Sequence, residues 1–412
     1  MSVAGGAVSQ ICTLLSAVAA ARILGKVSYG HLAGVQTAAI AFTNLASLGM
    51  GVVATKYVSE YRETDPDRAG RILGMASIAA IIAASVVWFA AMLFAAPVSA
   101  ATFGTASLAV DLRWASVYVF FTILNGYQAG TLAGLESFSR VARIGAAAGL
   151  AGLVCTVLLA GVFHEQGAAL AFGLTAFFVW VFHHWALPGE LRRFGIAVQY
   201  RGAWRERAAL LRFALPATYS GIAGALAVWW CSGYLVRQRG FAEAAVYAAA
   251  TNFRSVILFI PSLANRVTGP ALNNLLATGK SEAYRRVFRR SVAMNIVFAM
   301  ATAVFLAAVG RWLLTAFGKD FTASPRLLWI ILGSAVIEVT AGALYQATFA
   351  RPNLAWQVVV ISVWSALLVG LTRMLVPSIG TEGLAAAYAA AFASSTLIYA
   401  QIRVAVPADG SR

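Results

Sequence analysis

Acidic residues are scarce in this 412-residue chain, which has 15 Asp and Glu against 31 Lys and Arg and is only 11% charged. Soluble domains carry about 25% charged residues, because polar groups must cover their surface. Here 60% of the residues are hydrophobic without counting glycine. This composition excludes a soluble enzyme and predicts a membrane protein. Nucleic acid is not a predicted partner, since the basic residues lie in short segments between apolar runs.

Cysteine and histidine are also rare. Cys12, Cys155 and Cys231 lie in apolar stretches without CxxC spacing, so we expect small buried side chains rather than disulfides or metal ligands. His183 and His184 are adjacent, and neighbouring residues on a helix point in different directions. The sequence therefore predicts no metal site, and no cofactor.

Long apolar runs without alternation predict an all-α polytopic membrane protein with 12 transmembrane helices, because a helix needs about 20 apolar residues to cross the hydrocarbon core. We place the spans at 4–21, 33–55, 72–96, 112–133, 144–163, 168–187, 209–235, 244–269, 291–309, 327–349, 354–375 and 383–403. With both termini in the cytoplasm, the inner connections and the tail hold 20 basic residues and the outer connections nine. This asymmetry satisfies the positive-inside rule.

Sequence landmarks recur at a nearly constant offset. Phe103-Gly104 matches Phe317-Gly318, and Tyr127-Gln128-Ala129 matches Tyr345-Gln346-Ala347. Duplicated halves are typical of transporters, so we predict two six-helix bundles. The predicted domains are an N-terminal bundle (1–187), a basic cytoplasmic linker (188–208), a C-terminal bundle (209–403) and a cytoplasmic tail (404–412). The linker mixes arginine with apolar residues, so we expect either a segment that lies on anionic headgroups or a tether whose charges set topology.

Several motifs carry a resemblance to a known family. They are Arg22-Ile23-Leu24-Gly25, Tyr29-Gly30, Leu48-Gly49-Met50-Gly51, Lys56-Tyr57-Val58-Ser59-Glu60 and, in the second half, Pro216, Tyr247 and Pro270. This pattern resembles that of Wzx-type polysaccharide flippases, in the multidrug/oligosaccharidyl-lipid/polysaccharide (MOP) exporter superfamily.

The resemblance implies two MATE-like bundles around a cavity that opens to each side in turn. It implies a multi-pass protein of the cell inner membrane that moves undecaprenyl-diphosphate-linked oligosaccharide repeat units for O-antigen, capsule or exopolysaccharide synthesis. The implied partners are this lipid-linked oligosaccharide, membrane lipids and, as protein partners, a polysaccharide polymerase and a chain-length regulator. We expect a monomer.

Ionisable residues inside apolar spans are candidates for the substrate path, because each costs about 2.5–3.5 kcal/mol to insert. Arg254 lies midway along its predicted span beside Asn252, and a guanidinium can hold two oxygens of a diphosphate. We predict that both contact the headgroup, the alternative being an arginine bonded to carbonyls or to an acid on another helix.

Four further cations are weaker candidates. Arg22 and Arg266 lie near span ends, where snorkelling to the interface would also account for them. Lys56 and Arg143 lie at the predicted inner ends of their spans, where they extend a positive lining or merely set topology.

Glu338 is the single carboxylate well inside a predicted span. It suits proton coupling if it is dry and unpaired, or a structural ion pair with Arg266 or Arg254. We favour the ion pair.

Three classes of function remain. A drug or cation antiporter of the MATE kind would need acidic residues in its cavity, whereas arginine inside the spans favours an anionic substrate. A membrane-embedded sugar polymerase or acyltransferase would need a positioned acid, base or metal. The sequence therefore favours the flippase and predicts that the protein is not an enzyme.

Overall fold

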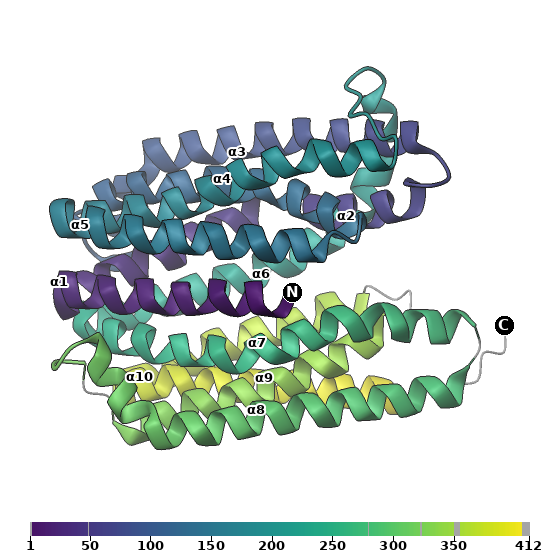
Figure 1. Cartoon of the computed structure of the whole chain (residues 1–412). Helices are drawn as coiled ribbons and strands as arrows, with labels where there is room; N and C mark the ends of the chain where they lie inside the picture. Colours follow the sequence, from purple (N-terminus) through teal and green to yellow (C-terminus); the bar gives the residue numbers. More distant parts are fainter. Residues whose placement is uncertain (1, 48, 279, 322–323, 350–354, 406–412) are drawn as a thin grey trace. The chain divides into compact units, whose positions relative to one another are not determined.

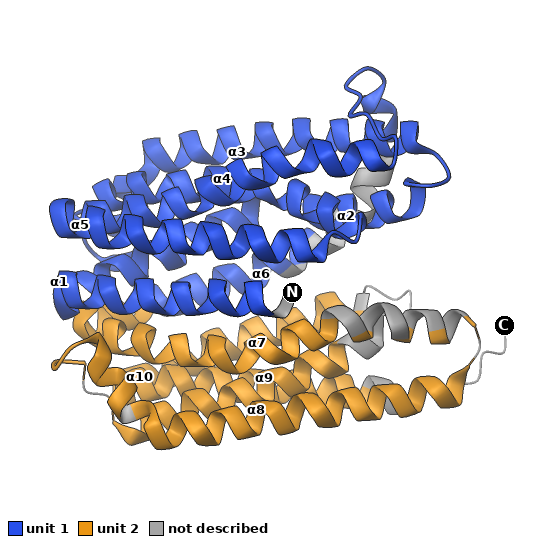
Figure 2. Ribbon diagram, in the orientation of Figure 1, with its two compact units in different colours: residues 1–233 blue, residues 234–412 orange. Residues whose placement is uncertain are grey.

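The computed structural model describes residues 2–47, 49–278, 280–321, 324–349 and 355–405, and all regular secondary structure in them is helical. Side chains fall outside the described part at 2–3, 208–217, 220, 266–267, 269–271, 273–274, 276–277, 311, 346–349, 355 and 402–405. The chain divides into two compact units, Met1–Gly233 and Tyr234–Arg412, here called unit 1 and unit 2 (Figure 2). Their boundary lies inside a helix, so unit 1 includes the predicted linker 188–208 and most of the predicted span 209–235.

Unit 1 is built from long helices joined by short turns (Figure 1). They are α1 (Ser2–Ala46), α2 (Met50–Tyr61), α3 (Pro66–Phe103), α4 (Ala109–Gly134), α5 (Phe138–Arg193), the short 3-10 helix η1 (Ala203–Glu206) and the first part of α6 (Arg207–Arg239). Unit 2 contains the end of α6 with α7 (Phe241–Ala277), α8 (Ser281–Phe317), α9 (Pro325–Phe349) and α10 (Ala355–Ala405).

Three of these helices contain a backbone break. The breaks lie at Gly25 in α1 (φ 78°), at His164 in α5 (φ 49°) and at Ile379 and Gly380 in α10 (Gly380 φ 57°). Each lies where the sequence predicts a connection between two spans, so these helices each hold parts of two predicted spans. Seven helices of the described part are long and apolar enough to cross a membrane. The count of twelve spans stays a prediction.

The predicted span 33–55 differs in the structure, where the helix ends at Ala46 and resumes at Met50. Gly49 adopts the left-handed conformation (φ 62°), which glycine tolerates and which a helix cannot continue through. The break places α2 against three glycines of α4, Gly126, Gly130 and Gly134. A Cβ on Gly130 would lie 2.1 Å from the carbonyl oxygen of Gly51, and Thr55 Oγ1 donates to the carbonyl oxygen of Gly130 at 3.0 Å. Glycine at these positions lets the two helices approach closely.

The helices of the two units follow a similar order of lengths. In unit 1, α3, α4 and α5 have 38, 26 and 56 residues, and in unit 2, α8, α9 and α10 have 37, 25 and 51. The last helix of each series carries a break. Gly104 and Gly318 of the two Phe-Gly pairs cap α3 and α8. This order supports the duplication that the sequence predicts.

The predicted linker is docked on the start of α3. Asp65 is the N-cap of that helix, and its side chain accepts a hydrogen bond from the Arg68 amide at 2.9 Å. The amide of Gln199 donates to the carbonyl oxygen of Gly70 at 3.0 Å, and Glu206 of η1 lies 3.4 Å from Arg68 and 3.6 Å from Arg71. The linker is therefore tethered to protein through backbone and charged contacts.

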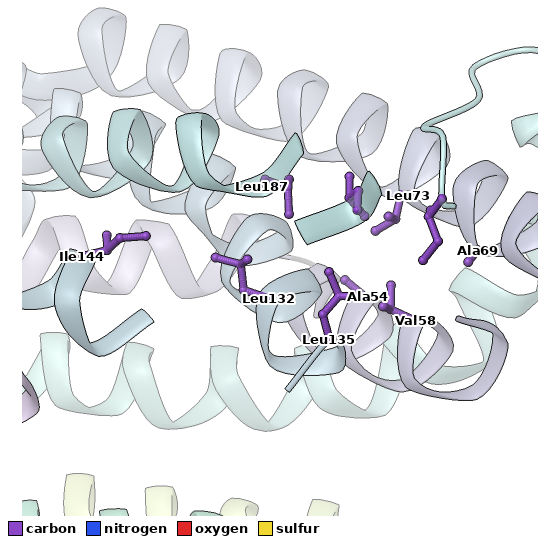
Figure 3. Packing of buried hydrophobic residues seen from close by; sticks show 10 residues of the cluster. Ala54, Val58, Ala69, Leu73, Leu132, Leu135, Ile144 and Leu187 are labelled. Carbon is purple, nitrogen blue, oxygen red and sulfur yellow. The ribbon is translucent and has the colours of Figure 1, made fainter. Parts of the chain in front are cut away.

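Apolar side chains pack together at the end of unit 1 where the linker is docked. Figure 3 shows the buried cluster, whose side chains come from α2, α3, α5 and the end of α4. Val58 and Leu132 are fully buried within it, and Ile196 of the linker adds to it. Burial of such side chains stabilises by about 1.5–3 kcal/mol each. This core fixes the ends of α4 and α5. A group of charged residues also lies at these helix ends.

Candidate functional site

The centre of the candidate site is an ion pair inside unit 2. Arg254 lies on α7 and Glu338 on α9, and Arg254 Nε donates to Glu338 Oε2 at 2.6 Å. The two helices pack against each other, and both side chains stay partly accessible, at 24% and 21%. The ion pair that the sequence favours for Glu338 is therefore present, with Arg254 as the partner.

Aromatic rings of α10 complete this site. The Arg254 guanidinium carbon lies 5.7 Å from the ring centroids of both Tyr388 and Phe392. These distances are within the range of a cation–π contact, which holds a cation without using its hydrogen-bond donors. We call Arg254, Glu338, Tyr388 and Phe392 the Arg254 site.

The donors of Arg254 are used unequally. Nε is bound to Glu338, whereas Nη1 and Nη2 make no hydrogen bond with any residue that the structure describes. A guanidinium has five N–H donors and no acceptor. Its outer edge can therefore bind an anion while its inner edge stays attached to the protein.

Asn252 and Arg254 are both on α7, but the structure does not bring them together. Asn252 Nδ2 donates to the carbonyl oxygen of Ala248 at 2.9 Å, along its own helix. Residues two apart on a helix face different directions. Arg266 is also on α7, and its side chain lies outside the described part.

The remaining predicted cations belong to unit 1. Arg22 is exposed on α1, three residues before the break at Gly25. Lys56 on α2 is half-buried, and its Nζ lies 5.2 Å from the ring centroid of Tyr57. Arg143 is exposed on the first turns of α5 and lines a cavity of about 240 Å³. Among the predicted site residues, the structure joins Arg254 and Glu338 in an ion pair.

Sequence reasoning missed a charged group at the end of unit 1 that lies opposite to Lys56 and Arg143. His31 Nδ1 lies 2.9 Å from Glu165 Oε2, and this contact joins α1 to α5. Asp111, a buried residue in the first turn of α4, lies near both side chains. One signal was available, because Asp111 and Glu165 flank predicted spans on the same side of the membrane. Across the described residues, no three His, Cys, Asp or Glu side chains are grouped so that they could hold a metal ion.

Sequence reasoning also missed an arginine cluster around Glu190, at the end of α5. Glu190 is 2% exposed and lies 3.0 Å from Arg140 Nη2 and 3.1 Å from Arg193 Nη1. Ser137 Oγ donates to it at 2.8 Å. The signal was weak, because Glu190 stands among basic residues that the positive-inside rule already explains.

Comparison with protein families gives one match: the family model described as "Polysaccharide biosynthesis protein" matches residues 1–276. A comparison with curated protein sequences gives no match.

Solved structures share the fold. A multidrug-resistance MATE transporter of the MOP superfamily, in an inward-facing conformation, superposes with a TM-score of 0.81 at 14% identity, over 96% of this chain and 94% of that one. The lipid II flippase MurJ gives 0.75 at 13% identity, over 97% and 86%. A MOP superfamily transporter from Pyrococcus furiosus gives 0.72 at 14% identity, over 98% and 94%.

These likenesses show that the chain has the MOP fold and is a multi-pass membrane protein. The similar structures are transporters and a flippase rather than enzymes. The predicted all-α, MATE-like fold is therefore confirmed, and the count of twelve transmembrane helices stays a prediction.

Proposed function

The chain belongs to the polysaccharide biosynthesis protein family, and from this membership and the Arg254 site we propose that it flips undecaprenyl-diphosphate-linked oligosaccharide repeat units across the inner membrane. The product serves the synthesis of O-antigen, capsule or exopolysaccharide. A Wzx-type role agrees with the likeness to the lipid II flippase MurJ, whose name describes a lipid-linked substrate.

The single observation that carries this proposal is the geometry of Arg254. Its Nε is fixed by Glu338 at 2.6 Å, and its terminal nitrogens make no hydrogen bond with described residues. A diphosphate offers several oxygens to such an edge, and arginine stays charged when partly dehydrated. The site is therefore suited to a phosphate-bearing headgroup.

The same geometry argues against a cationic substrate at this point. Glu338 is paired with Arg254, so this site holds no unpaired carboxylate of the kind that a cation antiporter would need.

The proposed mechanism is alternating access between bundles 1–187 and 209–403, with twelve spans and both termini in the cytoplasm. The headgroup crosses through a polar path while the polyprenyl tail stays in lipid. Arg22, Lys56, Arg143, Asn252 and Arg266 are the further cationic and polar contacts that we propose along this path. Substrate shifts the conformational equilibrium only as far as it binds the two states differently. We propose a monomer that supplies a polymerase and a chain-length regulator.

Substitution of Arg254 tests this function. In a strain that lacks the chromosomal copy, Arg254→Gln should leave lipid-linked repeat units on the inner leaflet and lower transport by about ten-fold or more, since a charge-assisted hydrogen bond contributes about 1.5–3 kcal/mol. Arg254→Lys keeps the positive charge but lacks the second donor edge, so its transport should lie between that of the wild type and that of Arg254→Gln. The measurement is the amount of repeat unit exposed to a periplasmic label at equal protein abundance.

Arg326 supplies the matched control, because it is exposed in the first turn of α9, on the helix that carries Glu338. Arg326→Gln should transport normally. Full transport by Arg254→Gln at normal abundance would refute the role of this site, and a deletion strain without accumulated repeat units would refute the function itself.

A MATE-like drug or cation antiporter is the second candidate. The observation in its favour is the group at the far end of unit 1, where His31, Glu165 and buried Asp111 provide two carboxylates. Deletion would then change drug susceptibility and leave lipid-linked repeat units unchanged.

A further inference from the structure

The arginine cluster around Glu190 borders a polar cavity of unit 1, and Arg143 of the proposed transport path also lines this cavity. The cavity measures about 240 Å³ and lies between the turn that joins α4 to α5 and the last turn of α5. Arg140, Arg143 and Arg193 line it, together with Ser139 and Glu190. Three guanidiniums in one small cavity require anions for balance.

Glu190 supplies only part of that balance. It is 2% exposed; its Oε2 accepts from Arg193 at 3.1 Å and from Ser137 at 2.8 Å, and its Oε1 forms an ion pair with Arg140 at 3.0 Å. One carboxylate therefore serves two arginines, which leaves one positive charge. It also holds both guanidiniums in fixed positions at the cavity wall, which reduces the entropy lost when they bind a ligand.

Arg143 adds a second uncompensated charge. It is exposed at the cavity and makes no ion pair or hydrogen bond with any residue that the structure describes. The other acidic side chain of the lining, Glu136, is paired with Arg62, whose Nη2 lies 2.9 Å from Glu136 Oε1. The lining therefore carries a net charge that a phosphate group would neutralise.

The position of the cavity selects a lipid as the source of that phosphate. It lies at the predicted cytoplasmic ends of the spans, and exposed aromatic residues occur close to the lining in sequence: Phe138 at 44%, between Ser137 and Ser139, and Trp185 at 74%, on α5 before Glu190. Exposed aromatic residues gather at headgroup level, and basic pockets on the cytoplasmic side bind anionic headgroups. A soluble anion would not need such anchors beside it.

We propose that the cavity formed by Arg140, Arg143 and Arg193 binds the phosphate of a lipid headgroup at the inner surface of the membrane. This site lies in unit 1 and is separate from the Arg254 site of unit 2. Two lipids carry the required chemistry, an anionic phospholipid of the bilayer and the diphosphate lipid of the proposed function, and the second identity rests on that function.

Lipid binding to the purified full-length protein tests this site. The probes are phosphatidylglycerol, undecaprenyl diphosphate and zwitterionic phosphatidylcholine, each added in detergent and measured by native mass spectrometry. Wild type should retain the first, the second or both in preference to phosphatidylcholine. Arg143→Gln should lower that retention about ten-fold through the loss of one charge-assisted contact. Arg143 is exposed and makes no ion pair or hydrogen bond with described residues, so this variant should fold normally.

Arg113→Gln is the matched control, an exposed arginine of the same unit at the predicted outer end of α4. It should retain lipid like wild type. Displacement of phosphatidylglycerol by undecaprenyl diphosphate identifies the substrate headgroup as occupant, and no displacement identifies the bilayer lipid. Equal retention by wild type, Arg143→Gln and Arg113→Gln overturns the proposal. Because Arg254→Gln should bind lipid here normally, failure of this site and failure of the proposed function give different results.

Discussion

Glu338 and Glu190 are each paired with arginine, but the number of arginines per carboxylate and the burial of the carboxylate differ between the two groups. Glu338 meets one guanidinium, and both side chains remain partly accessible. Glu190 is buried and meets two guanidiniums and a hydroxyl, which satisfy both of its oxygens. The comparison teaches that the ratio of cations to carboxylates and the burial of the acid decide what an ion pair can do. Glu338 holds one accessible arginine, the proposed headgroup contact, whereas Glu190 connects the first and last turns of α5.

Removal of both partners of Glu190 should have the largest effect. Arg140→Ala with Arg193→Ala leaves a carboxylate that is 2% exposed without a counter-charge. Such a loss costs about 3–5 kcal/mol of unfolding free energy. Denaturant unfolding in detergent measures it. Arg326→Gln should change the value by less than about 0.5 kcal/mol, and an equal change in both proteins would contradict the anchoring role.

Exchange of the charges at the Arg254 site should separate stability from transport. Glu338→Gln alone should cost about 1–2 kcal/mol, because the pair is partly accessible and water screens the remaining charge. The double variant Arg254→Glu with Glu338→Arg should recover most of that stability, yet transport should stay low because the guanidinium now starts from α9. Recovery of both properties would show that the pair is purely structural.

Loss of an aromatic contact should have the smallest effect. Phe392→Leu removes one of the two rings that lie 5.7 Å from the Arg254 guanidinium. A cation–π contact contributes about 0.5–1 kcal/mol at an accessible site. We expect transport to fall by a few-fold at normal abundance. Phe392→Tyr keeps the ring and serves as the control, and equal activity of all three proteins would exclude a positioning role for this ring.

The helix breaks show how much of the fold the sequence could predict. Breaks at Gly25, His164 and Gly380 lie in predicted connections because the apolar runs stop there. The break at Gly49 could not be found this way, since Leu48, Gly49 and Met50 continue the apolar run. That break depends on a left-handed glycine and on the close approach of α2 to α4.

The two ion pairs show the same limit for the site. Arg254 and Glu338 stand in apolar spans, so the sequence favoured an ion pair for Glu338 and left its partner open between Arg266 and Arg254; the structure pairs it with Arg254. Glu190 stands in a basic segment where the charge count explains every arginine without assigning partners. Hydropathy locates isolated charges, but contacts between residues 53 positions apart, such as Ser137 and Glu190, depend on tertiary packing.

The docked linker leaves a trace in the sequence of α3. A Cβ at Gly70 would lie 2.0 Å from the carbonyl oxygen of Ala197, and one at Gly74 would lie 2.1 Å from that of Gln199. No side chain larger than a hydrogen atom fits at either position while the linker follows this route. A relative with alanine or a larger residue there must lead its connecting segment along another face, so these two glycines distinguish family members that share this arrangement from those that do not.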